Sequence, residues 1–280
     1  MNGWFVEMIR DHFTPNLLAF ERHLSGLASA VCLIVESPGS MAELGAFSVT
    51  KGIAERLMVV VRQKYTDDAS FIELGPLAHL KDLKPERDRI FRYEWAVDWD
   101  AAEKQPIASL SDLEKIAQDF IEDLQTFDRE NPKKVSFNRE TPGHVSLFLC
   151  DVIDLFLGMK LRELAEICAA IRLEMSEKNL KEHLTILDKI GLIKILPYRG
   201  STYYVSIKDN NNYIDYEFKG APPDLIDRNR FKFNVAELYK KADESRWNAI
   251  ASAVKLSGRS IGELTRTGLP AGHGKAVGND

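Results

Sequence analysis

Two glutamates, Glu36 and Glu43, flank a short turn of serine, proline and glycine in the first fifth of the chain. Before the turn, residues 30–35 form a short apolar, β-branched run that predicts a strand buried on both faces. After the turn, Ser40-x-x-Glu43 fits a capping box that opens a helix. Ligands of parallel sheets bind beyond the carboxyl ends of the strands, where Glu36 is expected. Carboxylates beside such a ligand crevice could have a catalytic role.

Each glutamate also has a purely structural interpretation. A glutamate in the first turn of a helix commonly only stabilises the helix N-terminus, by up to about 1 kcal/mol. A carboxylate at the end of a strand is often simply solvated. The residue types and spacing alone therefore leave the roles of Glu36 and Glu43 open.

The segment from Glu36 to Phe47, ESPGSMAELGAF, resembles the signature of the nucleoside deoxyribosyltransferase-like effectors encoded beside retron reverse transcriptases. The resemblance continues through residues 56–61 and 70–77 and covers roughly residues 1–95. It implies that Glu43, in the Glu-Leu-Gly part of the motif, is the nucleophile of an N-glycosidase. Glu36 is the nearest counterpart of the family's assisting acidic residue, one residue out of register.

The implied reaction is cleavage of the N-glycosidic bond of a nucleotide or of a dinucleotide such as NAD. Glu43 attacks the anomeric carbon while the base departs, and water or another base then resolves the ribosyl-enzyme. Backbone N–H groups around Ser37, Pro38, Gly39 and Ser40 are expected to hold a phosphate at the helix N-terminus. No cofactor is expected. The six histidines show no HxH or HExxH spacing, so no metal site is expected either.

The resemblance also implies a biological setting. Such effectors act as toxins in anti-phage defence, and the reverse transcriptase with its RNA-linked single-stranded DNA (msDNA) restrains them until infection. These two are the predicted partners, and homo-oligomerisation is left open. The family adds a carboxy-terminal DNA-binding domain.

Length and composition are those of an ordinary globular protein of two modest domains. The 280 residues carry a net charge of −5, which argues against a wholly basic nucleic-acid-binding surface. Cys32, Cys150 and Cys168 lie in apolar segments without metal-ligand spacing, which indicates free buried thiols and a reducing cytoplasm. The chain shows no signal-peptide pattern and no apolar run of ~18 residues that could span a membrane.

The predicted organisation is a Rossmann-like α/β domain followed by an α+β winged helix-turn-helix domain. The predicted boundaries are 1–100 for the deoxyribosyltransferase-like domain, 101–142 for a connector with a long amphipathic helix, 143–218 for the winged-helix domain, 219–256 for a helical extension and 257–280 for a disordered tail.

Apolar spacing predicts the individual elements. Predicted helices are 4–9, 15–27, 71–83 (broken at Gly75-Pro76), 113–127 (capped by Ser111), 145–157, 161–171, 176–190 and 233–254; predicted strands are 57–61, 89–95, 192–196, 202–207 and 213–218, with 97–109 as a connector.

Nucleic-acid binding is expected on the third helix of the winged-helix domain and on its hairpin. Residues 159–208 contain nine Lys and Arg against six Asp and Glu, a local charge of +3. Lys178 and Lys181 are expected on the exposed side of the helix, and Tyr198 and Arg199 at the hairpin tip. Winged helices also dock proteins or dimerise, and +3 is a small excess, so the charge pattern alone does not decide.

The start of the chain departs from the family pattern. The family's catalytic domain opens with one or two further strands, whereas residues 4–29 show a helical pattern. If residues 1–280 are the whole protein, we expect no base release and an exposed or partner-covered edge at residues 30–35. An alternative function is a DNA-binding regulator whose α/β domain senses a nucleotide without cleaving it. A catalytically inactive scaffold is a third interpretation.

Overall fold

The computed structural model describes residues 17–63, 70–94, 97–100, 105–108, 110–131, 135–207, 213–216 and 227–258. These residues fall into two compact units that divide between Phe137 and Asn138. We call them the N-terminal unit and the C-terminal unit and describe each by itself. The helix expected at 4–9 and nearly all of the tail expected at 257–280 lie outside the described residues.

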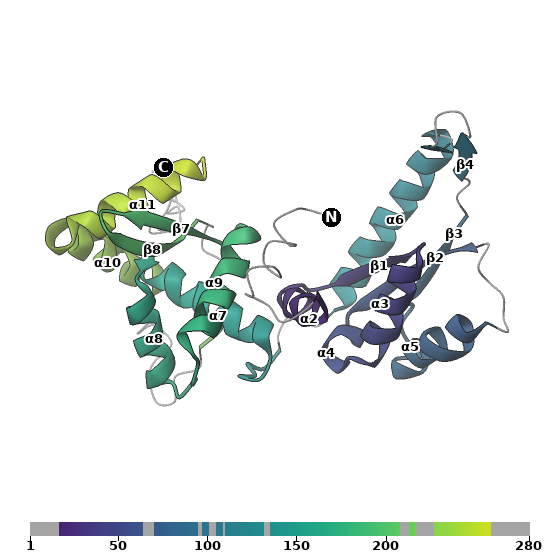
Figure 1. Cartoon of the computed structure of the whole chain (residues 1–280), viewed down its shortest axis with the longest axis horizontal. Coiled ribbons are helices and arrows are strands. Elements are labelled where there is room, and N and C mark those ends of the chain that lie inside the picture. The colour runs from purple at the N-terminus through teal and green to yellow at the C-terminus, as the bar shows by residue number, and fades with distance from the viewer. Residues whose placement is uncertain are drawn as a thin grey trace, which may run out of the picture. The chain divides into compact units, whose positions relative to one another are not determined.

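The N-terminal unit contains a three-stranded parallel sheet, as the α/β pattern predicts (Figure 1). Its strands are β1 (Val31–Val35), β2 (Leu57–Arg62) and β3 (Ile90–Tyr93), in that order. Within the described residues β1 pairs only with β2, so β1 forms an edge of the sheet, and its Ile34 is 47% exposed.

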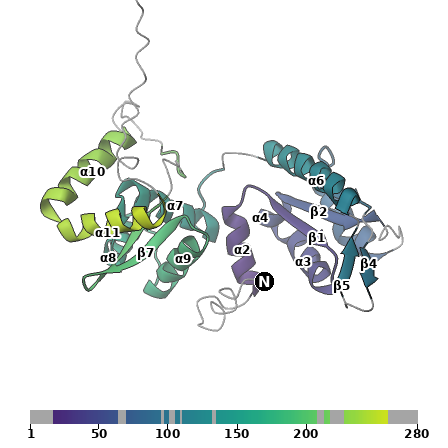
Figure 2. The same ribbon diagram turned by 90° about the horizontal axis from the view of Figure 1, so that it is seen from above.

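Helices cover both faces of this sheet. Figure 2 shows β1 and β2 between α3 (Pro38–Val49) on one side and α6 (Leu110–Glu130) on the other. The α3 side is the larger core, built around Leu33, Val35, Leu44, Phe47, Val59 and Val61. On the α6 side, Met58, Val60 and Phe127 are buried together. The alternation along β2 therefore sends side chains into two separate cores.

The remaining helices of this unit are short. They are α2 (Leu17–Leu27), α4 (Lys51–Ala54), the π-helix η2 (Glu73–Leu77) and α5 (Ala78–Leu83). The predicted break at Gly75-Pro76 is wrong, because the backbone continues through a π-helical turn that accommodates Pro76. The start of α2 predicted at Pro15 lies outside the described residues.

Two predictions around the connector are also wrong. Residues 97–109 contain an antiparallel hairpin of β4 (Val97–Asp100) and β5 (Gln105–Ala108). Helix α6 begins at Leu110, so Ser111 lies within the helix and is not its cap.

The C-terminal unit begins with three helices in the predicted places. They are α7 (Pro142–Leu155), α8 (Leu161–Ala170) and α9 (Glu177–Lys189), and Ser176 caps α9 by accepting a hydrogen bond from the Asn179 N–H at 3.2 Å. The predicted hairpin follows as β7 (Ile193–Tyr198) and β8 (Ser201–Ser206). A short strand not predicted, β6 (Gly158–Met159), pairs with the far side of β8.

Helices α10 (Arg228–Ala242) and α11 (Glu244–Leu256) replace the single helix predicted at 233–254 (Figure 1). Asp243 separates them, because its carboxylate accepts the Arg246 N–H at 3.0 Å and caps α11. Together the two helices bury one side of the β-sheet through a cluster that includes Tyr203, Val205 and Ile250. The opposite side packs against α7, α8 and α9.

A buried ionic network joins α10 to α7. Lys232 donates to the Asp154 carboxylate at 2.9 Å, and Arg228 forms two hydrogen bonds with Asp151, at 3.0 and 3.1 Å. Asp151 also accepts the backbone N–H groups of Tyr213 and Ile214. Residues 213–216 form no strand, so the strand predicted at 213–218 is wrong over this part, and residues 217–218 lie outside the described residues.

Candidate active site and candidate nucleic-acid interface

The turn between β1 and α3 positions the predicted substrate-binding residues. Ser37 is the N-cap of α3, with its hydroxyl accepting the Ser40 N–H at 3.2 Å. Ser40 is therefore not the N-cap, and the Ser40-x-x-Glu43 capping box is wrong. The reason is Pro38, whose fixed φ and missing N–H suit the first helical position, so the helix starts there.

The two serines also use most of the N–H groups expected to hold a phosphate. The Ser40 hydroxyl accepts the N–H groups of Glu36 and Ser37, at 3.0 and 2.9 Å. Pro38 has no N–H. Of the four residues Ser37 to Ser40, Gly39 alone keeps a backbone N–H without a hydrogen bond. A phosphate there would have to displace a serine hydroxyl or bind to Gly39.

Glu36 and Glu43 occupy different parts of this site. Glu36 is exposed just beyond the carboxyl end of β1. Glu43 is half-buried in the second turn of α3, about 7.5 Å along the helix axis from Pro38 at 1.5 Å per residue. The structure thus places Glu36 at the sheet edge and Glu43 further down the helix that follows it.

A third carboxylate, Glu21 on α2, was not among the predicted site residues. Burial raises the pKa of Glu21, and the charge of Glu43 raises it further. The sequence does contain a pattern that could have singled out Glu21. Glu21 adjoins the apolar side of α2 that Phe20, Leu24 and Leu27 mark at helical spacing, where a carboxylate is unexpected.

Two polar pairs lie at the carboxyl end of β3, the third strand of the sheet. Arg92 donates to both carboxylate oxygens of Glu73, at 2.7 and 2.8 Å. The Tyr93 hydroxyl donates to Asp123 at 2.6 Å, and burial together with this hydrogen bond raises the pKa of Tyr93. In both pairs the polar groups are hydrogen-bonded to each other. We therefore assign these residues a structural role at the carboxyl end of the sheet and no catalytic role.

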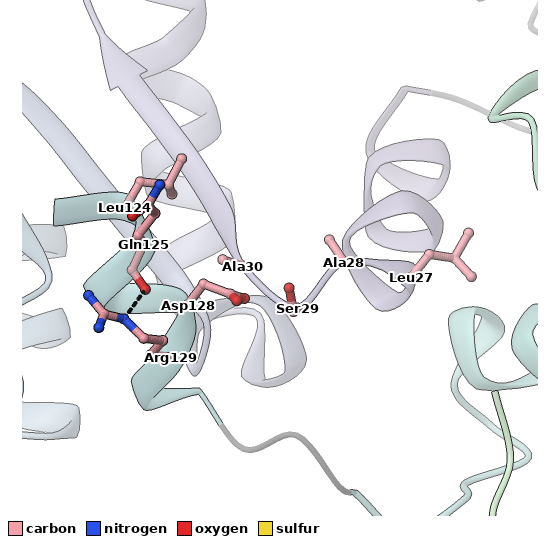
Figure 3. Close-up of a pocket in the computed structure, with 8 residues that line it drawn as sticks. All are labelled: Leu27, Ala28, Ser29, Ala30, Leu124, Gln125, Asp128 and Arg129. Carbon is pink, nitrogen blue, oxygen red and sulfur yellow. Dashed lines mark hydrogen bonds between the residues drawn. The ribbon is translucent and has the colours of Figure 1, made fainter. Parts of the chain in front are cut away.

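A pocket of about 830 Å³ lies at the opposite end of β1 (Figure 3). Residues 27–30, just before β1, line one side, and Leu124, Gln125, Asp128 and Arg129 of α6 line the other. Arg129 is turned back onto its own helix and donates to the Gln125 carbonyl at 3.2 Å. Since β1 begins at Val31 and ends at Val35, this pocket is not the predicted active site.

Cysteine or metal chemistry has no support in the described residues. Cys32, Cys150 and Cys168 are free, and burial raises the pKa of Cys32 to about 11 and that of Cys150 to about 12. These two thiols are therefore protonated and unreactive at neutral pH. Among the described residues no three His, Cys, Asp or Glu side chains come together in a way that could hold a metal ion.

The predicted nucleic-acid-binding residues of α9 are exposed. Lys178 and Lys181 both lie on the solvent side of the first two turns. Lys181 pairs with Glu177 at 2.5 Å, and this hydrogen bond raises the pKa of Lys181. Lys178 therefore presents the less neutralised charge of the two.

The hairpin tip holds the other two predicted residues. Arg199 and Gly200 both have positive φ, 46° and 79°, as a two-residue type I′ turn requires. The Arg199 guanidinium lies 5.5 Å from the centre of the Tyr198 ring and is exposed. The turn thus projects an arginine at the end of the hairpin.

In the described part of the chain, none of the helices combines the length and the apolar character needed to cross a membrane.

Comparison with known proteins gives consistent matches. The family model described as STM3845 retron effector protein matches residues 3–195. An Escherichia coli relative, described as the candidate ribosyltransferase/DNA-binding protein of retron Ec73, is 28% identical over 255 residues, which cover 86% of this chain and 74% of the relative. A second E. coli relative, the candidate ribosyltransferase/DNA-binding protein of retron Ec86, is 32% identical over 77 residues, covering 28% of this chain and 25% of the relative.

Proposed function

The chain belongs to the STM3845 retron effector family, and on that premise we propose that it is an anti-phage effector that cleaves an N-glycosidic bond. The N-terminal unit, a deoxyribosyltransferase-like α/β layer, carries the reaction. The C-terminal unit, a winged helix, binds nucleic acid. The names of both E. coli relatives, which combine ribosyltransferase and DNA-binding protein, support this division.

The observation that carries the proposal is the strand–turn–helix at β1 and α3. It presents one carboxylate, Glu36, at the carboxyl edge of a parallel sheet, and a second, Glu43, on the helix that the turn starts. Sites of parallel sheets lie at this edge. The Glu-Leu-Gly motif that contains Glu43 supports its role as the nucleophile.

In the proposed mechanism a Glu43 carboxylate oxygen bonds to C1′ of the sugar. The C1′–N bond breaks, and its electron pair leaves with the base. Water then attacks C1′ and releases Glu43, so the sugar configuration is retained overall. Glu36 orients the sugar, and Gly39 is the backbone donor most available to a 5′-phosphate. The substrate class is a nucleotide or a dinucleotide such as NAD.

For the C-terminal unit, the three helices, the β7–β8 hairpin that follows them and the short strand β6 on the other side of β8 support a winged helix, with the hairpin as the wing. Lys178, Lys181, Tyr198 and Arg199 are the proposed contacts to phosphates and bases. The proposed partners are the retron reverse transcriptase and its msDNA, which restrain the effector until infection.

The test of the nucleophile is Glu43→Gln, because an amide cannot form the ribosyl ester. Wild type and variant are each prepared as residues 1–280 and as the longest reading frame that contains them. Growth of expressing cells, their nucleotide pools and base release by purified protein are measured. We expect the wild type to release a base in at least one of the two preparations and the variant to release none in either. Glu114→Gln, an exposed glutamate on α6, is the control and should behave as wild type. Equal toxicity of wild type and Glu43→Gln would contradict the proposal.

The test of the C-terminal unit replaces Lys178, Lys181 and Arg199 together by alanine. Each lost phosphate contact should lower the salt dependence of DNA binding, by a total slope of roughly two to three. An unchanged slope would mean that this surface does not contact DNA.

The second candidate function is a DNA-binding regulator with a non-catalytic nucleotide-sensing domain. The observation in its favour is that the two serines of the turn already satisfy most N–H groups of the phosphate site. Specific duplex binding that responds to a nucleotide, without any cleavage of that nucleotide, would support it.

A further inference from the structure

Two aromatic rings of the C-terminal unit each lie beside a cation. Tyr198 ends β7, and the Arg199 guanidinium is 5.5 Å from the centre of its ring. Trp247 lies in the first turn of α11, and the Lys240 ammonium of α10 is 4.8 Å from the centre of its ring. Both aromatic side chains are only partly buried, so part of each ring is open to a ligand.

Both rings border the same apolar cluster. Tyr198 and Trp247 pack from outside against the residues that α10 and α11 bury on the β-sheet. Helix α11 packs against β7. Figures 1 and 2 both show the start of α11 at the end of the sheet where β7 turns into β8. Tyr198, Arg199, Lys240 and Trp247 therefore belong to one surface, which we call the ring–cation surface.

The basic surplus of the C-terminal unit lies on the elements that carry this surface. The hairpin, residues 193–206, contains two basic and no acidic residues. Helices α10 and α11 contain seven Lys and Arg against three Asp and Glu, and two of the seven pair with the buried Asp151 and Asp154. Helix α9, by contrast, contains three of each. A polyanion is therefore attracted more strongly to the ring–cation surface than to α9 alone.

Arg199 occupies a costly backbone position. Its φ of 46° falls in the left-handed region, which the first residue of a type I′ turn requires and which glycine, asparagine and aspartate adopt at lower cost. An arginine there is unusual, and residues strained in this way cluster at ligand-binding sites. The turn also holds the guanidinium at the end of the hairpin, next to the Tyr198 ring. A ligand therefore explains this arginine better than the needs of the turn do.

We propose that the ring–cation surface binds a single strand of nucleic acid. The rings of Tyr198 and Trp247 stack on unpaired bases, and Arg199 and Lys240 contact the neighbouring phosphates. This inference rests on the nucleic-acid binding proposed for the C-terminal unit. It goes further by naming the strandedness of the ligand and a second contact surface, on α10, α11 and the hairpin, in addition to the lysines of α9.

The chemistry of the surface favours unpaired bases over a duplex. A base offers its flat face to an aromatic ring only when it is unpaired or splayed out, whereas a duplex presents base edges and phosphates. Two aromatic rings on one surface would therefore gain little from a duplex. A phosphate can also replace Glu237 at Lys240 at little cost, because this ion pair is exposed and contributes little to stability.

The experiment measures binding of the full chain to a fluorescent oligothymidylate, to an oligouridylate and to a DNA duplex of the same length, by anisotropy at several salt concentrations. Tyr198→Leu and Trp247→Leu keep an apolar side chain but remove the aromatic ring. We expect each to bind the single strands about 5- to 150-fold more weakly and the duplex nearly as well as wild type. Tyr198→Phe and Trp247→Phe, which keep a ring, should retain most of the affinity. The control Phe71→Leu removes an 84% exposed ring of the N-terminal unit and should change nothing.

The salt dependence tests the two cations separately. Arg199→Gln combined with Lys240→Gln removes both charges, so the salt dependence of single-strand binding should become shallower, by a slope of roughly 1.4. An unchanged slope would overturn the phosphate contacts. Leucine variants that lose affinity for strand and duplex equally, or for neither, would overturn the stacking. A wild type that binds only the duplex would overturn the ring–cation surface alone, whereas one that binds neither would also contradict the nucleic-acid binding proposed for the C-terminal unit.

Fluorine NMR detects the contact directly and does not depend on the folding of the leucine variants. The chain has four tryptophans, and in fluorotryptophan-labelled protein the signal of Trp247 is assigned by its absence from Trp247→Phe. Adding oligothymidylate should shift this signal more than the other three, and adding the duplex should not shift it. A Trp247 signal that stays in place while the strand binds would refute the stacking role.

Discussion

Replacing Lys232 by methionine should strongly destabilise the C-terminal unit. The Lys232 ammonium is 2.9 Å from Asp154, and both side chains are only 2% exposed. Methionine fills similar volume but removes the cation. Asp154 would keep Arg228, at 3.2 Å, and the Ser206 hydroxyl, at 3.0 Å. Breaking a buried ion pair typically costs about 3–5 kcal/mol. Because two partners remain, we expect about 2–4 kcal/mol.

Urea unfolding, monitored by hydrogen exchange in peptides from α7 and α10, would measure the decrease in the free energy of unfolding of the C-terminal unit alone. The matched control is Lys240→Met on the same helix, whose ammonium pairs with Glu237 and lies 4.8 Å from the centre of the Trp247 ring; the pair is 36–41% exposed, so its loss should cost much less than that of Lys232. The double variant with Asp154→Leu should recover part of the loss, since no charge is then left unpaired. A Lys232→Met variant as stable as Lys240→Met would refute the reasoning.

Two further outcomes follow from packing and burial in the same unit. A Cβ at Gly158 would lie 2.8 Å from the Ile250 Cγ1, so Gly158→Ala should cost about 1–3 kcal/mol in urea unfolding, whereas Gly52→Ala, with open space around it, should not. Burial lowers the pKa of His183 from 6.5 to about 4, so the unfolded chain binds a proton first as the pH falls. Stability should therefore drop by about 2 kcal/mol between pH 7 and 5, and His183→Gln should remove that slope.

The amino-acid pattern predicts the elements whose apolar spacing is unambiguous. Strands β1 and β2, helices α7 to α9 and the β7–β8 hairpin all lie within a few residues of their predicted places. The exact start of a helix is harder to predict where two nearby residues can each serve as its N-cap. Ser37 and Ser40 can each cap a helix, and only the demand of Pro38 for the first helical position decides between them.

Other features depend on contacts that no local pattern contains. The β4–β5 hairpin was missed because Pro106 weakens the strand pattern of residues 105–108. Asp243 divides α10 from α11 by a cap within an otherwise helical pattern. The effect of the Glu43 charge on the pKa of Glu21 arises only when α2 packs against α4. The carboxylates at positions 36 and 43 were therefore predictable, and their electrostatic partner was not.

The two-sided sheet of the N-terminal unit has a consequence for synthesis on the ribosome. Strands β1 and β2 with α3 and α4 form one local unit, complete once residue 62 has emerged. Met58 and Val60, however, face α6, which begins at Leu110. At 5–20 residues per second, the roughly 50 intervening residues take about 2–10 s to make. During that interval the nascent chain exposes the apolar sheet face that α6 later covers, while Glu43 on α3 is already in place. A chaperone bound to this face would prevent aggregation and would delay the reaction proposed for Glu43.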